Sequence, residues 1–159
     1  MTEDARFEDA DPRGPLRLRA LDEDDLRVLS SLVQDAVVSR RDLTWQKSQR
    51  RFAMLLNRFR WEDIATSERR QLPAERVRTM LVVEDVERVA SAGLDEADGD
   101  TPLCLLAIQW QPGEDGAGIL TFPLAGGGAI RVEVEALEMV LRDVTRPYPA
   151  PSGRVPRHP

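Results

Sequence analysis

Apolar and basic residues alternate over Leu16–Ala20, a pattern typical of a half-buried β-strand. A helix is predicted to begin directly after this strand, because Asp22 is a good N-cap and acidic residues suit the first turn of a helix. Leu21 and Leu26 stand where a hydrophobic staple would close across that cap. The acidic run 22–25 is therefore interpreted as a helix start rather than as a metal or general-base site.

The next segment, residues 36–61, is predicted to form a β-hairpin. Its first arm covers 36–46 with an interruption near Arg41, and the sequence QKSQ forms the turn before a second arm over 51–61. Apolar residues in the second arm change face near Asn57, which predicts a β-bulge. Helical spacing of the same apolar residues leaves a helix open as the alternative for 51–61.

Further strands are expected downstream, after a polar loop or short helix over 62–73. A long strand with a kink near Glu84 is predicted first. The nearly continuous apolar run Leu103–Trp110 predicts a central strand buried on both faces. A hairpin loop is expected over 112–118.

The segment 125–144 alternates cleanly from Ile130 and then changes phase near Ala136, so it predicts a second bulged strand in the same sheet. A helix over 137–144 remains the alternative. The motif at 82–88, VVEDVER, resembles VEVEALEM at 132–139. This weak repeat suggests two related three-stranded units.

These elements together predict an α+β, mostly β protein with one N-terminal helix. The architecture is a curved antiparallel sheet or open barrel of about six to seven strands. Residues 16–146 are expected to form a single domain, between a loose N-terminal tail over 1–15 and a proline-rich C-terminal tail over 147–159.

Composition narrows the class of protein. A length of 159 residues suits one domain, and no apolar run reaches the length needed to span a membrane. The acidic N-terminus lacks the apolar core of a signal peptide, and a single cysteine suits a reducing cytoplasm. The chain carries a net charge of −6, yet residues 40–78 hold 11 basic and 5 acidic side chains. A basic middle segment therefore lies between two acidic flanks.

Few residues are suited to catalysis or to metal binding. The only histidine, His158, is the second-last residue, and Cys104 lies in the most apolar run, where a buried and unreactive thiol is expected. The glycines of AGGGAI (125–130) lack the spacing of a phosphate-binding loop and precede an alternating β pattern, so they predict a hairpin turn. The sequence predicts no catalytic residues, no metal site and no cofactor.

The segment RRFAMLLNRFRWE (50–62) is the one candidate for binding. It combines apolar residues with Arg50, Arg51, Arg58, Arg60 and Trp61, which could present guanidinium groups and a stacking ring to an acidic protein partner. A sequence pI near 4.9 and the neighbouring acidic residues disfavour nucleic acid. The alternative is that these arginines only neutralise the acidic flanks of the chain.

Several strings, in this order, resemble the DUF2948 family of small bacterial cytosolic proteins: QDAV, DLTW, RRFAMLLNRFRWE, LCLLAIQW, GGGAIRVEVE and the closing PRHP. The resemblance spans about Leu16 to Pro159. It implies no activity and no catalytic residues, because the family is uncharacterised.

Two functions are therefore expected as alternatives. The first is a non-catalytic cytosolic binding or adaptor protein that uses the basic segment 40–78. The second is a small-ligand protein or enzyme that uses arginine and acidic residues in the mouth of a barrel. An exposed arginine surface favours the first, whereas a closed pocket with buried, perturbed carboxylates favours the second.

Overall fold

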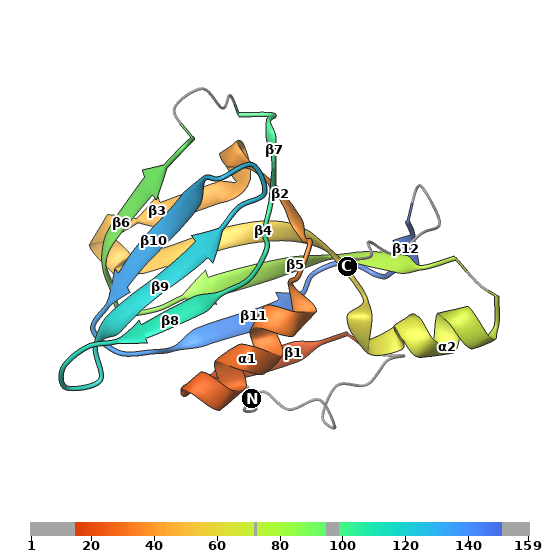
Figure 1. The fold of residues 1–159 in the computed structure, drawn as a ribbon, viewed down its shortest axis with the longest axis horizontal. Helices are drawn as coiled ribbons and strands as arrows, with labels where there is room; N and C mark the ends of the chain where they lie inside the picture. Colours follow the sequence, from red (N-terminus) through yellow and green to blue (C-terminus); the bar gives the residue numbers. More distant parts are fainter. Residues whose placement is uncertain (1–14, 72, 95–98, 151–159) are drawn as a thin grey trace.

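The computed structural model of the chain describes residues 15–71, 73–94 and 99–150, and within these ranges the structure consists of two antiparallel sheets (Figure 1). The larger, eight-stranded sheet contains β1 (Arg17–Ala20), β2 (Val37–Ser39), β3 (Leu43–Gln46), β4 (Arg51–Phe59), β5 (Glu75–Val83), β7 (Pro102–Cys104), β11 (Met139–Asp143) and β12 (Tyr148–Pro149). The smaller, four-stranded sheet contains β6 (Val86–Ala92), β8 (Gln109–Pro112), β9 (Gly118–Pro123) and β10 (Ala129–Val134). The predicted antiparallel, mostly β class is confirmed.

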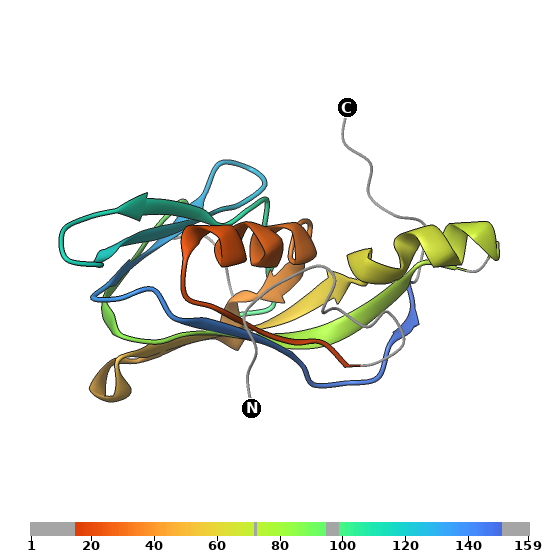
Figure 2. The same cartoon turned by 90° about the horizontal axis from the view of Figure 1, so that it is seen from below.

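The strand order of the larger sheet is β1-β11-β5-β4-β2-β7, with β3 added to β4 and β12 added to β5. The order of the smaller sheet is β6-β10-β9-β8. Both orders are open-ended, so neither sheet closes into a barrel. Helix α1 (Glu23–Leu32) and the smaller sheet lie on the same side of the larger sheet (Figure 2).

The main core fills the space between α1 and the two sheets. It contains the inward-facing residues of alternating strands, such as Met54, Leu81 and Leu120, together with Leu29 from the helix. Neither α1 nor the smaller sheet covers the opposite face of the larger sheet (Figure 2). We call this opposite face the outer face.

Helix α1 begins as predicted. The Asp22 carboxylate accepts a hydrogen bond from the Asp25 backbone N–H at 2.8 Å, and the Asp25 carboxylate accepts one from the Leu21 N–H at 3.1 Å. The predicted staple is only half formed, because Leu26 is buried while Leu21 is 43% exposed. The helix start therefore depends on hydrogen bonds at the cap more than on the apolar contact.

The predicted hairpin over 36–61 is also present. Its first arm is divided into β2 and β3 by the 3₁₀ turn η2 (Arg40–Asp42), and the turn η3 (Lys47–Gln49) leads into β4. The helical alternative for 51–61 is wrong, because β4 pairs with β5 throughout its length.

The bulge predicted near Asn57 is absent. The register between β4 and β5 runs without interruption from Phe52, opposite Val83, to Phe59, opposite Arg76. The apolar residues change face for a different reason. The next inward position of β4 is occupied by Arg58, which is not apolar but still points inward. Phe59 then faces outward, where it joins a small second cluster with Ala74 and Ala150.

The phase changes near Glu84 and Ala136 mark places where the chain passes from one sheet to the other. At Asp85, which has a φ of 56°, the chain leaves β5 in the larger sheet and enters β6 in the smaller one. The return passage, over 135–138, joins β10 to β11. The two corners are adjacent, since the Glu84 N–H donates to the Glu138 carbonyl at 3.0 Å and the Glu135 N–H donates to the Asp85 carbonyl at 2.9 Å.

These corners correct two predictions. The long strand predicted with a kink near Glu84 is divided into β5 and β6 of different sheets, and the prediction for 125–144 is corrected as well. That segment is not one bulged strand in a single sheet, because β10 and β11 belong to different sheets. The helical alternative for 137–144 is wrong as well, since β11 occupies 139–143. The resembling motifs VVEDVER and VEVEALEM are the two corner segments, which lie side by side.

The apolar run Leu103–Trp110 was expected to be one central strand, and this prediction is wrong. It supplies the edge strand β7 of the larger sheet, a single bridge from Leu105 to Leu124, and the edge strand β8 of the smaller sheet. Leu106 is 40% exposed where the chain crosses between the sheets. The run is apolar because it contributes to the core from two edges, not because it lies at the centre of one sheet.

Two short helical segments follow β4, at the position of the predicted loop. They are the 3₁₀ turn η4 (Trp61–Asp63) and α2 (Ile64–Arg69). None of the helices in the described ranges has the length and apolar character needed to cross a membrane.

At the C-terminal end, β12 pairs with β5, and Ala150 is buried. Tyr148 and Pro149 of the predicted C-terminal tail thus belong to the sheet. The predicted N-terminal tail up to residue 14 and the remainder of the C-terminal tail, including His158, lie outside the described residues.

Candidate functional site

The five residues predicted to bind a partner do not share one exposed surface. Arg50 and Arg51 keep 46% and 42% of their side chains exposed, whereas Arg58 is fully buried and Arg60 keeps only 4%. Strand alternation explains the difference within β4, because Arg51 occupies an outward position and Arg58 an inward one.

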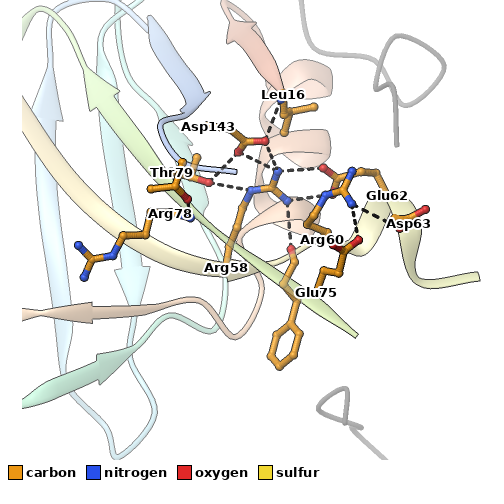
Figure 3. A network of polar contacts seen from close by, with 11 residues as sticks. Leu16, Arg58, Arg60, Glu62, Asp63, Glu75, Arg78, Thr79 and Asp143 are labelled. Carbon is orange, nitrogen blue, oxygen red and sulfur yellow. Dashed lines mark hydrogen bonds and ion pairs between the residues drawn. The ribbon is translucent and has the colours of Figure 1, made fainter. Parts of the chain in front are cut away.

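Arg58 is held by a network that connects the three strands β4, β5 and β11, the turn η4 and the residue just before β1 (Figure 3). Its Nε donates to Thr79 Oγ1 at 3.0 Å, Nη1 donates to Glu62 and to the Phe59 carbonyl, and Nη2 donates to Glu62 and Asp143. The remaining contacts complete the network, since the Thr79 hydroxyl and the Leu16 backbone N–H both donate to Asp143 at 2.8 Å.

Every N–H of the Arg58 guanidinium is used in this network. Burial acts to lower the pKa of Arg58, but hydrogen bonds and charge from Glu62 and Asp143 raise that pKa above its ordinary value. For Glu62, burial alone would raise the pKa, and the contact with Arg58 lowers it overall. The perturbed carboxylate is thus explained by a saturated ion pair, which has no donor left for a ligand.

Arg60 and Trp61 are also engaged by the fold. Arg60 Nη1 donates to Glu75 at 2.7 Å and to Asp63 at 3.4 Å, and its Nε and Nη2 have no partner among the residues that the structure describes. The Trp61 indole N–H donates to the Gln34 carbonyl at 3.0 Å. Its ring packs against Phe59 with centroids 5.7 Å apart, so Trp61 is not a free stacking platform.

Arginines gather instead on the outer face of the larger sheet. Alternation along β1, β4, β5 and β11 directs one side chain in two to this face. We call this surface the arginine face, and its arginines are Arg17, Arg19, Arg51, Arg76, Arg78 and Arg142. Five half-buried apolar residues lie among them: Ala53, Leu55, Met80, Val82 and Val140.

An open hollow of about 320 Å³ lies on the arginine face. Met80, Val82 and Val140 line it with apolar atoms, and Arg17 and Arg142 stand at one end. Glu84 and Glu138 lie beside each other at the other end, where Arg51 pairs with Glu84. The hollow therefore has an apolar floor, an ion-paired end and a basic end.

The basic end carries charge that the protein does not neutralise. Arg17 and Arg142 lie directly opposite each other on β1 and β11, and neither has a carboxylate partner within the described part of the chain. Like charges directly opposite each other destabilise a sheet. This pair is thus the place on the arginine face where an anionic group would be bound most favourably.

Arg76 contributes less to binding than its charge suggests. It stacks over the Phe59 ring at 4.1 Å from the centroid, and its guanidinium donates to the Asn57 side chain and carbonyl. Asn57 in turn donates to the Tyr148 hydroxyl at 2.6 Å, which attaches β12 to the sheet. This end of the arginine face is structural, whereas the end with Arg17 and Arg142 is free.

The other residues considered for chemistry have structural explanations. The glycines of AGGGAI form the predicted turn between β9 and β10, with positive φ at Gly126 and Gly127. No group of three or more His, Cys, Asp or Glu suited to a metal ion occurs in the described residues. Cys104 is half-buried on an edge strand rather than enclosed in a central one. Burial raises the pKa of its thiol, and Asp35 raises it further against the opposing charge of Arg76.

Sequence reasoning identified Arg51 but missed Arg17 and Arg142. The alternation in LRLRA already places Arg17 and Arg19 on one face of a strand. A similar alternation in β11 directs Arg142 to one face and its neighbour Leu141 to the other. Their common location depends on the pairing of β1 with β11, which are more than a hundred residues apart in the chain.

Comparison with known proteins gives one match. The family model described as "Protein of unknown function (DUF2948)" matches residues 16–158, nearly the whole chain. No match was found among the curated proteins or among the solved structures. The chain thus belongs to the DUF2948 family.

Proposed function

We propose that this protein is a non-catalytic binding protein of the bacterial cytoplasm, which docks an acidic segment of a partner protein on the arginine face. The observation that carries the proposal is the pair Arg17 and Arg142, which is exposed, lacks ion pairs in the described chain and forms one end of a hollow with an apolar floor. The cytoplasmic location is supported by the single cysteine.

Charge complementarity favours an acidic protein over a second copy of this chain. The arginine face holds six arginines against Glu84 and Glu138, so two such faces brought together would repel each other. Opposite charge on the partner would instead speed encounter and stabilise the complex.

A protein partner is also favoured over nucleic acid and over a small ligand. The overall charge of −6 opposes a polyanion, and the aromatic rings near this face, Phe59 and Tyr148, are engaged by Arg76 and Asn57. Small-molecule sites enclose most of their ligand, whereas this hollow is open. The buried carboxylates Glu62 and Asp143 supply no argument for catalysis, because Arg58 occupies them.

The test compares two double charge reversals of tagged protein in affinity capture from native lysate. Arg17→Glu with Arg142→Glu inverts the basic end of the hollow. The matched control, Arg88→Glu with Arg131→Glu, inverts two exposed arginines on the neighbouring strands β6 and β10 of the smaller sheet. We expect the first variant to lose partners that wild type and control both retain, and capture by wild type to decrease steeply with salt.

Equal capture by both variants, with both folded by circular dichroism, would exclude the arginine face as the binding surface. A wild-type dimer in sedimentation experiments that dissociates only in the Arg17→Glu/Arg142→Glu variant would assign the face to self-association instead. Either result overturns the proposed function.

A further inference from the structure

The cross-strand register arranges the hollow in three rows. Arg142 lies opposite Arg17 and Met80 in a basic row. Val140 lies opposite Val82 in a second row, and the β1 member of this row, Arg19, is ion-paired with Glu138, so its accessible side chains are apolar. Glu138 and Glu84 form the third row, because the Glu84 N–H donates to the Glu138 carbonyl. Successive rows are two residues apart along each strand, a distance of roughly 6.7 Å.

Only the basic row has charge available for a ligand. In the third row Glu84 pairs with Arg51, and Glu138 pairs with Arg19 at 2.9 Å, so that row is close to neutral. Arg17 and Arg142 have no such partner in the described ranges. A ligand that fits the hollow would therefore carry a carboxylate at one end, an aliphatic group next to it and an uncharged polar group beyond.

An extended polypeptide has the same repeat as these rows. Side chains at positions i, i+2 and i+4 of a strand point to one face and are also roughly 6.7 Å apart. The facing residues of a helix, three or four positions apart, advance only roughly 4.5 or 6 Å along its axis, so they drift out of register over three rows. The row spacing thus favours an extended segment over a helical one.

We propose that the hollow recognises an extended acidic segment in which a Glu or Asp and an aliphatic residue stand two positions apart. The carboxylate binds Arg17 and Arg142, and the aliphatic side chain packs on Val82 and Val140. This inference rests on the proposed function and adds to it the sequence pattern of the partner.

The test uses two labelled peptides of identical composition. The matched peptide, Thr-Glu-Thr-Val-Thr-Gln-Thr, places its glutamate and valine on one face of a strand. The comparison peptide, Thr-Glu-Val-Thr-Thr-Gln-Thr, places them on opposite faces. By NMR titration of the full chain we expect the matched peptide to bind about tenfold more tightly. We also expect this preference to disappear in Arg17→Gln/Arg142→Gln and to persist in Arg88→Gln/Arg131→Gln.

The outcomes separate this inference from the proposed function. If both peptides bind equally and both lose affinity in Arg17→Gln/Arg142→Gln, the spacing pattern is wrong while the acidic partner stands. If the Arg17→Gln/Arg142→Gln substitution changes neither affinity, the surface itself is wrong and both proposals fail. Peptide shifts confined to β6 and β10 would also overturn both.

Discussion

Arg58 is a residue on which several separate elements converge. It lies on β4 and contacts Thr79 of β5, Asp143 of β11 and Glu62 of η4, and Asp143 also accepts a hydrogen bond from Leu16 just before β1. Replacing such a buried charge by an apolar residue leaves its partners uncompensated, and this is costly even though the intact pair contributes little.

We predict that Arg58→Met destabilises the protein by roughly 3–5 kcal/mol, because Glu62 and Asp143 would lose the buried cation that both of them contact. Chemical denaturation at neutral pH measures this directly. The control, Arg78→Met, removes an exposed arginine from β5 and is expected to change stability by less than about 0.5 kcal/mol. Equal stability of the two variants would contradict the structural role of Arg58.

The pH dependence of protein stability provides a second test of the same variant. In wild type the pKa of Glu62 lies below its ordinary value of 4.5, so its contribution is present above that pH and is lost on further acidification. Without Arg58, which Glu62 shares with Asp143, burial would raise the pKa of Glu62. Protonation then removes this buried charge, and the stability difference between wild type and Arg58→Met is expected to narrow as the pH falls from about 7 to about 4.

At the scale of elements, the hairpin β8–β9 depends on a close approach between its strands. A Cβ atom at Gly118 would meet the Trp110 ring and would lie 2.6 Å from the Gln111 carbonyl oxygen. The oxygen belongs to the backbone of β8, so it cannot rotate away as a flexible side chain could. The register of β8 against β9 therefore requires glycine at this position.

We predict that Gly118→Ala destabilises the protein by about 1–3 kcal/mol through this overlap. Gly116 in the same hairpin loop supplies the control, since a Cβ there has nothing within 4 Å and only its φ of +86° opposes alanine. Thermal unfolding should show a larger loss for Gly118→Ala than for Gly116→Ala, for which about 1 kcal/mol is expected. The reverse order would show that the strands can separate at little cost.

For the whole molecule, β12 is the last strand within the described residues. The Ala150 N–H donates to the Ala74 carbonyl at 2.7 Å, and Tyr148 accepts a hydrogen bond from Asn57. Residues 147–150 thus cover the small cluster around Phe59.

We predict that removing residues 147–159 lowers the Tm by several degrees, since each kcal/mol lost shifts the Tm of a domain of this size by about 2–4 °C. Removing only 152–159 is expected to leave the Tm nearly unchanged, because that stretch is rich in proline and poor in apolar residues. Calorimetry that compares the Tm of the two truncated chains with the Tm of the full chain tests this prediction. A similar loss in both would mean that residues after Ala150 also stabilise the fold.

Much of the local structure could be predicted because its causes lie close together in the chain. The cap at Asp22, the hairpin into β4 and the turn at 125–128 follow from hydrogen-bonding side chains, alternation and glycine within a few residues. Interactions between residues that lie this close in the chain can be inferred from the sequence alone. They establish which segments are strands and which side chains share a face of each strand.

Tertiary structure alone decided how these strands are shared between sheets. The alternation of β4 assigns Arg58 to the face of Phe52 and Met54, but only the positions of Glu62, Thr79 and Asp143 make a buried arginine stable there. Likewise, an apolar run looks the same whether it crosses one sheet or joins two edges, as Leu103–Trp110 does.

The arginine face also combines features that the sequence determined with features that only the tertiary structure decided. Alternation places Arg17 and Arg142 on one face of their own strands, and this much the sequence by itself determined. Their opposition across β1 and β11 and the apolar floor of the hollow that they line depend on contacts between distant segments. Such contacts arise from burial of the shared core, so no local pattern in the chain contains them.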